Sequence, residues 1–238
     1  MDGSIVSVES RGRGTVGELK GATHQFYEDR FRLLSKEIEI VREAERGEIF
    51  AVFDGVSSAP MGMRSAQAMA DALIAFFTEP DSHQPTTDGL RRLILEANQE
   101  IFEWGMENSL PRGGCAGTIA WLSGEEVTLF HAGDTEAWLF RDGTCLNMVG
   151  REAGGSIYLT EYFGKGEQLQ LTTRGFKVLP GERLLLFTDG LRKVVDQVGI
   201  DSLLCSPHSP EDCLRDLLVE CEMAYAPDDV TALIIVGD

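Results

Sequence analysis

The chain has 238 residues, of which 43% are hydrophobic and 25% charged, which excludes a disordered or collagen-like protein. Asp and Glu outnumber Lys and Arg by 39 to 21, giving a net charge of −18. This charge would repel a nucleic-acid backbone or an anionic membrane, so we expect neither as a partner.

The cysteines and the lengths of the apolar segments indicate the cellular compartment of the protein. The five cysteines, an odd number without a CxxC pair, favour free thiols in a reducing environment: Cys115, Cys145, Cys205, Cys213 and Cys221. The first residues do not resemble a secretory signal. No apolar run approaches the ~18–20 residues that a membrane span needs. We therefore expect a cytoplasmic protein.

In chain order, an apolar strand at Ile49–Phe53 comes first and is followed by two segments of helical period. Met63–Phe77 predicts one helix. Leu90–Trp104 predicts the next, with Asp88 as its N-cap and Gly105 as its C-terminal stop. Because no linker or repeat interrupts the chain, a single domain is the simplest interpretation.

Short strands dominate the second half of the chain, at Thr118–Leu122, Val127–Phe130, Ala137–Phe140, Leu184–Phe187 and Val230–Val236. Ser123-Gly124 and Asp142-Gly143 resemble hairpin turns. A third helix precedes the last strand, with Ser209 as N-cap and Pro210 at its first position. Paired helices and hairpin strands favour an α+β fold with antiparallel sheets.

Acidic residues stand at the strand ends: Glu28-Asp29, Asp54, Asp134, Asp189 and Asp228-Asp229. Carboxylates that converge at one edge repel each other unless cations or protons intervene. Oxygen ligands favour Mg(II) or Mn(II) over Zn(II), and two such ions can activate a bridging water and clamp phosphoryl oxygens. The alternative is that each is a turn aspartate, since Asp-Gly is a common turn dipeptide.

Six segments form an ordered series: Tyr27–Phe31 (YEDRF), Phe50–Val56 (FAVFDGV), Gly114–Thr118 (GCAGT), Ala132–Leu139 (AGDTEAWL), Leu184–Leu191 (LLLFTDGL) and Asp228–Thr231 (DDVT). The series resembles the motifs of the metal-dependent protein phosphatases of the 2C type, including N-E-D-R, a strand ending in D-G, G-T-T, V-G-D-S-R-A-Y-L, L-L-L-C-S-D-G-L and D-N-V-T. Each motif alone is weak, but their order covers nearly the whole chain.

The resemblance implies a four-layer α-β-β-α sandwich of two antiparallel sheets flanked by helix pairs, formed by residues 1–238 as a single domain. It also implies a serine/threonine protein phosphatase, a hydrolase of phosphoric monoesters in which a metal-bridging water attacks phosphoserine or phosphothreonine. The expected cofactors are two Mn(II) or Mg(II) ions, with a third in some members. The expected partners are phosphorylated proteins in a signalling pathway with its own kinase.

The resemblance also assigns roles to individual residues. The expected metal ligands are Glu28, Asp29, Asp54, the Gly55 carbonyl, Asp189 and Asp228, with Asp134 at the third, weaker site. Asp54 would bridge two ions, and the expected catalytic residues are Asp54, Asp189 and His24. Asp229 stands where the family has Asn, so ligation is assigned to Asp228.

Three departures from the family pattern concern the substrate. His24 replaces the phosphate-binding Arg and would donate to phosphate more weakly, unless it is an ordinary strand residue. Val56-Ser57-Ser58 provides no evident general acid, and Arg64 either supplies positive charge or lies on a solvated helix face. Gly150–Ser156 replaces the T-x-D-H-S segment, which predicts a reduced flap.

These departures leave a second hypothesis: a catalytically weak pseudophosphatase that acts as a regulatory or binding module. A haloacid-dehalogenase-type site is rejected because it needs an Asp two positions before its second Asp, and Val52 occupies that position. The four His lack the spacing of a zinc site. Trp104, Trp121 and Trp138 follow helical or strand periods and are expected in the core.

Overall fold

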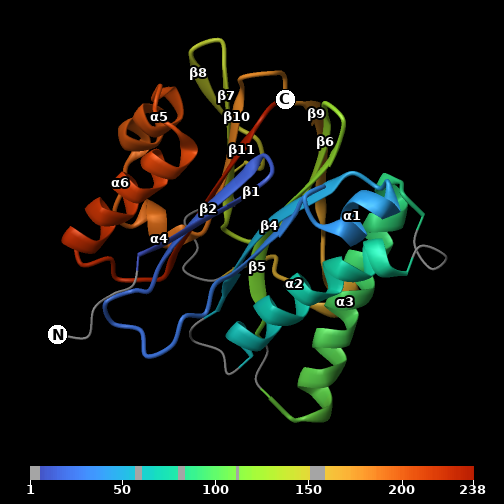
Figure 1. Cartoon of the computed structure of the whole chain (residues 1–238). Helices are drawn as coiled ribbons and strands as arrows, with labels where there is room; N and C mark the ends of the chain where they lie inside the picture. The colour runs from blue at the N-terminus through green and yellow to red at the C-terminus, as the bar shows by residue number, and fades with distance from the viewer. Residues whose placement is uncertain (1–5, 57–60, 80–83, 111–112, 151–158) are drawn as a thin grey trace.

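The computed structural model describes residues 6–56, 61–79, 84–110, 113–150 and 159–238 (Figure 1). Two antiparallel sheets lie face to face, and helices cover the outer face of each sheet. This arrangement is the four-layer α-β-β-α sandwich expected from the sequence, so the predicted fold class is confirmed.

Within the described ranges, the first sheet has six strands, ordered β1 (Ser7–Arg11), β2 (Gly14–Leu19), β11 (Val230–Val236), β10 (Arg183–Phe187), β7 (Glu136–Arg141) and β8 (Thr144–Asn147). The second has five, ordered β3 (Arg30–Leu34), β4 (Glu48–Gly55), β5 (Cys115–Ser123), β6 (Glu126–Ala132) and β9 (Thr172–Lys177). The strand runs predicted from the sequence all fall within these elements.

The five-stranded sheet is covered by α1 (Glu39–Ala44), α2 (Gly62–Thr78) and α3 (Thr87–Glu107). The six-stranded sheet is covered by α4 (Asp189–Arg192), α5 (Gln197–Cys205) and α6 (Pro210–Met223). A short 3-10 helix, η1 (Gly166–Gln168), contacts α3. Among the described helices, none is both long and apolar enough to cross a membrane.

The central strands are apolar on both faces because each strand contributes to two cores. In β4, Ile49, Ala51 and Phe53 pack in the cluster beneath α2 and α3. Phe50 and Val52 belong instead to the cluster between the two sheets. Successive side chains of a strand point to opposite faces, so a strand buried on both faces has a continuous apolar sequence.

The strand register brings particular strand ends together. Arg30 on β3 is opposite Phe53 on β4. Asp29, which precedes Arg30, and Asp54, which follows Phe53, therefore lie at the same end of this antiparallel strand pair. In the other sheet, Phe187 at the end of β10 is opposite Ala232, close to the start of β11. The acidic residues at these ends are therefore gathered at one edge of the sandwich.

The helix ends differ in part from the predictions. Thr86, and not Asp88, is the N-cap of α3, because its side chain accepts a hydrogen bond from the N–H of Gly89 at 3.0 Å. The helix also continues through Gly105, where a Cβ atom would lie 2.8 Å from Met61 Cε, so this glycine accommodates a packed side chain. The Ser209 cap of α6 is confirmed by a 3.1 Å bond from the N–H of Asp212.

Candidate active site

Asp54 lies at the centre of the acidic cluster. Burial raises the pKa of Asp54 well above its usual range, and the negative charges of its neighbours raise it further: Asp29, Asp189, Asp134 and Asp228. The structure therefore brings together five of the acidic residues singled out in the sequence. A carboxylate in such surroundings is stabilised by a cation or a proton.

Asp29 joins the two sheets at this edge. Its carboxylate is buried, and Oδ2 accepts hydrogen bonds from the hydroxyls of Thr188 and Thr231, both at 2.8 Å. Thr188 follows β10 and Thr231 lies on β11, so the donors come from the sheet opposite β3. Burial, followed by the charges of Asp229 and Asp228, raises the pKa of Asp29 well above its usual range despite these bonds.

Glu28 precedes Asp29 and has one buried carboxylate oxygen, Oε2, without a hydrogen-bond partner among the described residues. Gly55 lies close to it on β4. A Cβ atom on Gly55 would be 2.9 Å from the Glu28 carbonyl oxygen and 2.7 Å from the carbonyl carbon of Gly62. The backbone of β4 can therefore approach Glu28 and the start of α2 only with glycine at this position.

Lys193, a residue not predicted from the sequence, contacts two of the candidate ligands. Its ammonium group lies 2.7 Å from Asp189 Oδ2 and also donates to Asp228 Oδ2. Burial disfavours its charge, but the hydrogen bonds to Asp189 and Asp228 leave the pKa of Lys193 raised above its usual range. The signal in the sequence was the spacing of Asp189 and Lys193, four residues apart at the start of a helix.

His24 lies in a loop between β2 and β3 and not in a strand, so the alternative interpretation of it as a strand residue is wrong. Its Nε2 atom is 3.2 Å from Asp228 Oδ1. Its Nδ1 atom is 3.3 Å from Asp229 Oδ1, without hydrogen-bond alignment. The imidazole is thus directed at two carboxylates that precede β11.

Asp229 organises the loop that carries His24 and Glu28. It is only 2% exposed, and each of its two carboxylate oxygens accepts a hydrogen bond from a backbone N–H. The donors are Gly21, at 2.8 Å, and Glu28, at 2.6 Å. Both oxygens of Asp229 therefore accept hydrogen bonds from backbone N–H groups. The neighbouring Asp228 instead has an oxygen directed at Lys193.

The other candidate groups have different surroundings. The guanidinium of Arg64 stacks on Trp104, 3.6 Å from the ring centroid, and the residue is exposed. Arg64 thus lies on a solvated helix face, which was one of the two interpretations of this residue. Of the three tryptophans expected in the core, Trp121 and Trp138 are buried there, whereas Trp104 is half-buried. Ser57, Ser58 and residues 151–156 lie outside the described residues.

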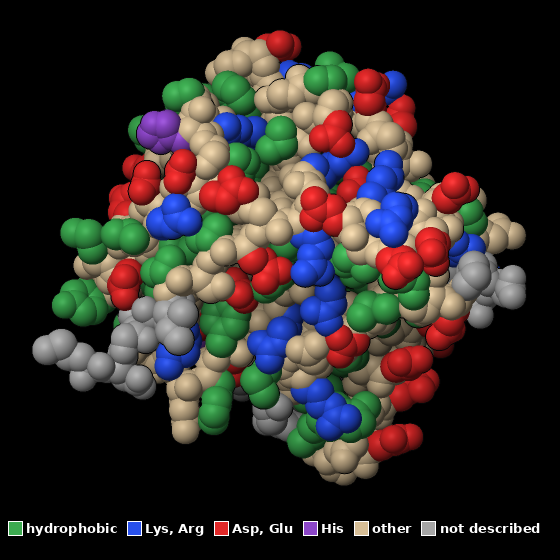
Figure 2. Space-filling view, viewed as in Figure 1, with side chains coloured by type: hydrophobic (Ala, Val, Ile, Leu, Met, Phe, Trp, Pro, Cys, Tyr) green, Lys and Arg blue, Asp and Glu red, His purple; other side chains and the backbone are tan. Residues whose placement is uncertain are grey.

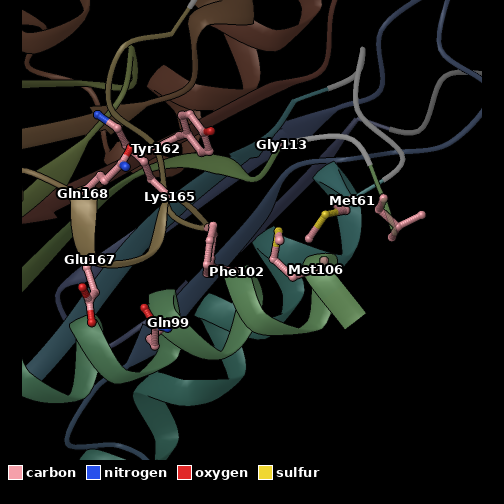
Figure 3. Close-up of a pocket in the computed structure, with 12 residues that line it drawn as sticks. Met61, Gln99, Phe102, Met106, Gly113, Tyr162, Lys165, Glu167 and Gln168 are labelled. Carbon is pink, nitrogen blue, oxygen red and sulfur yellow. The ribbon is translucent and has the colours of Figure 1, made fainter. Parts of the chain in front are cut away.

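The segment that follows residues 151–156 is fixed to α3. The buried amide of Asn98 accepts hydrogen bonds from the N–H groups of Gly164 and Lys165 and donates to the Gly166 carbonyl. Beside this anchor lies a cavity of about 350 Å³, with side chains from α3 on one wall and Tyr162 and Lys165 on the other (Figure 3). This cavity is distinct from the acidic cluster, since none of the acidic residues discussed above lines it.

The acidic cluster fits a hard divalent cation by its chemistry. Its ligand atoms are carboxylate and carbonyl oxygens, which Mg(II) and Mn(II) prefer, and Glu28 Oε2 is a buried oxygen that accepts no hydrogen bond from the described residues. As arranged, no three His, Cys, Asp or Glu side chains among the described residues form a set ready to hold a metal ion. Asp189 and Asp228 are instead joined by the ammonium of Lys193.

Solved structures of bacterial proteins, two of them named as phosphatases, have the same fold. PppA of Pseudomonas aeruginosa, described as a key regulatory component of the T6SS, superposes with a TM-score of 0.80 at 22% identity, covering 98% of this chain and 100% of that one. The phosphatase MsPP of Mycobacterium smegmatis, in complex with cacodylate, gives 0.77 at 22% identity, with 98% and 100% covered. The catalytic domain of PstP, in complex with two manganese ions, gives 0.75 at 22% identity, with 95% and 98% covered.

No curated protein sequence matches the chain significantly. The family model for protein phosphatase 2C matches residues 22–217, a span that begins before His24 and ends within α6. This span contains every candidate site residue except Asp228 and Asp229, which follow it before β11. The chain belongs to the protein phosphatase 2C family.

Proposed function

We propose that this chain is a metal-dependent phosphatase of phosphoserine and phosphothreonine in proteins. The observation that carries the proposal is the position of the half-buried Asp54 beside four other acidic residues at one edge of the sandwich, drawn from both sheets. Family membership supports the reaction class, and PstP, which has the same fold, was solved with two manganese ions.

The proposed ligands are Glu28, Asp29, Asp54, the Gly55 carbonyl, Asp189 and Asp228, for two Mn(II) or Mg(II) ions. Asp134, which contributes to the field at Asp54, is proposed for a third. Such ions supply an activated water and neutralise phosphoryl oxygens. The protein's own contribution is to hold the carboxylates: Thr188 and Thr231 fix Asp29 by hydrogen bonds.

Charge limits how the substrate reaches this site. Acidic side chains are spread over the face seen in Figure 2, with Lys and Arg between them, and the net charge is −18. A phosphate dianion is repelled by such a surface until cations neutralise the acidic cluster. His24 is proposed to assist phosphate binding when protonated, although in the structure its Nε2 atom is directed at Asp228.

The cellular setting is also a proposal. The five cysteines are all unpaired, which favours a reducing compartment such as the cytoplasm. We further propose that residues 1–238 form one phosphatase domain with a reduced flap, acting on phosphorylated proteins in a kinase-linked signalling pathway.

The alternative is a pseudophosphatase that acts as a regulatory module. The observation that favours it is that Asp228 is engaged by both His24 and Lys193. A protein of this kind would use the same fold to bind a partner without hydrolysing phosphate.

The test compares Asp54→Asn with Asp71→Asn, because Asp71 is an exposed residue of α2 that pairs with Arg32. Hydrolysis of p-nitrophenyl phosphate and of phosphoserine, phosphothreonine and phosphotyrosine peptides is measured with Mn(II), Mg(II) or excess chelator. We expect metal-dependent release of phosphate that falls at least about 100-fold in Asp54→Asn and is unchanged in Asp71→Asn. A folded wild-type protein without activity in any metal would favour the regulatory module.

A further inference from the structure

Lys193 bridges two carboxylates that come from different parts of the chain. Asp189 begins α4, whereas Asp228 precedes β11. The lysine ammonium lies 2.7 and 2.9 Å from the two oxygens of Asp189 and donates to Asp228 Oδ2. Lys193 thus provides a positive charge at the point where the proposed ligands of the two elements meet.

The backbone fixes this arrangement. Gly190, which follows Asp189, packs directly against the backbone ahead of β11, and a Cβ atom there would lie 1.8 Å from the Asp229 carbonyl oxygen. The start of α4 therefore cannot move away from Asp228 without loss of close packing. Both carboxylates are mostly buried, with 27% and 21% of their side chains exposed.

The lysine side chain is less constrained than the carboxylates it joins. It is 40% exposed, and it extends from the residue that follows α4. An ammonium group on a flexible stem can turn towards solvent, whereas the carboxylates remain on their rigid elements. An oxygen that accepts from the ammonium is also less available to a divalent cation, because the two positive charges repel each other.

We propose that Lys193 is a tethered cation that competes with a divalent metal ion for Asp189 and Asp228, so that the metal binds only when the ammonium group leaves. Lys193 then sets the affinity of the site for metal and stabilises the acidic cluster when metal is scarce. The inference rests on the proposed function insofar as Asp189 and Asp228 are taken as ligands. Lys193 is a positioning residue in this account and not a catalytic one.

The experiment compares Lys193→Gln with Lys177→Gln, which removes the same charge. Lys177 lies on β9 and pairs with Glu125 and Glu126, away from Asp189 and Asp228. Calorimetric titration with Mn(II) should give a dissociation constant at least about tenfold lower for Lys193→Gln than for wild type and Lys177→Gln. In excess chelator, Lys193→Gln should unfold at a lower temperature than Lys177→Gln, and added Mn(II) should remove the difference.

A charge-conserving variant, Lys193→Arg, should bind Mn(II) with the affinity of wild type. Equal affinities of Lys193→Gln and Lys177→Gln, weaker binding in Lys193→Gln, or tight binding in Lys193→Arg would each overturn the inference. So would the absence of Mn(II) binding in both wild type and Lys193→Gln. Phosphatase activity is not a readout here: wild-type protein that binds Mn(II) but hydrolyses no phosphoester refutes the proposed function and leaves the inference to stand on the titrations.

Discussion

Gly190 is the position at which a single methyl group should disturb the site most. The ideal Cβ of an alanine there lies 1.8 Å from the Asp229 carbonyl oxygen and 3.4 Å from Asp228 Cβ. Carbon and oxygen atoms that are not bonded need about 3 Å or more, so α4 and the start of β11 must separate by roughly 1 Å. Both segments are buried, and overpacking of this kind costs about 1–3 kcal/mol or more.

The expected cost is partly offset, because alanine is favoured over glycine in a helix by about 0.5–1 kcal/mol. With a packing cost near the upper end of this range, the net loss is about 2 kcal/mol, and a chain of this size should melt about 4–8 °C lower. The same displacement would separate Asp189 from Asp228, so Mn(II) affinity should fall as well. Stability is measured by thermal denaturation followed by circular dichroism, and affinity by calorimetric titration.

Gly175→Ala is the matched control. Gly175 lies in β9, where a Cβ atom meets no atom of the described residues within 4 Å and the backbone does not need glycine. This variant should melt at or slightly above the wild-type temperature. If Gly190→Ala melts within about 2 °C of Gly175→Ala and binds Mn(II) equally well, the packing argument for α4 and β11 is refuted.

Two further predictions concern stability. Asn98→Ala should lower the free energy of unfolding by about 2–4 kcal/mol in urea titrations, since three backbone groups of residues 164–166 lose their hydrogen-bond partners. The control Asn108→Ala removes one exposed hydrogen bond to Trp104 and should cost less, so equal losses in the two variants would contradict the prediction. The hydrogen bond from Arg141 lowers the pKa of Glu182 below its ordinary value of 4.5. The ionised Glu182 therefore stabilises the fold at any pH above 4.5, and this stabilisation is lost as the pH falls through the lowered pKa. Glu182→Gln should therefore lose less stability than wild type between pH 7 and pH 3 in urea titrations, and an unchanged pH dependence would count against the Arg141 pair.

The central strands could be predicted from the sequence because their apolar runs supply two cores at once. Edge strands could not. β1 (Ser7–Arg11) and β9 (Thr172–Lys177) are largely exposed, so burial imposes no apolar period on them. β2 was missed for another reason: at Gly17 an added Cβ would lie 2.8 Å from Leu218 on α6, so helix packing replaces an apolar side chain with a glycine.

The acidic cluster could be anticipated because strand ends in antiparallel sheets meet at defined edges. The contacts of its positive groups with Asp228 could not. Lys193 reaches Asp228 only through the position of α4 against β11, and His24 reaches it through the loop after β2. Both contacts join residues far apart in the chain, where no short-range period or motif carries the information.

Asp229 shows how a departure from the family pattern can be structural. A carboxylate has two acceptor oxygens, and both are used here, by the N–H groups of Gly21 and Glu28. An amide at the same place would offer one acceptor and turn a donor towards the other N–H, leaving that buried group without a partner. The aspartate therefore suits a loop held at both ends, and its negative charge raises the pKa of the neighbouring Asp29. Because the loop is fixed by a charged group and not by a neutral amide, the acidic cluster carries one more negative charge that cations must balance. The ammonium group of Lys193 balances part of this charge from within the chain.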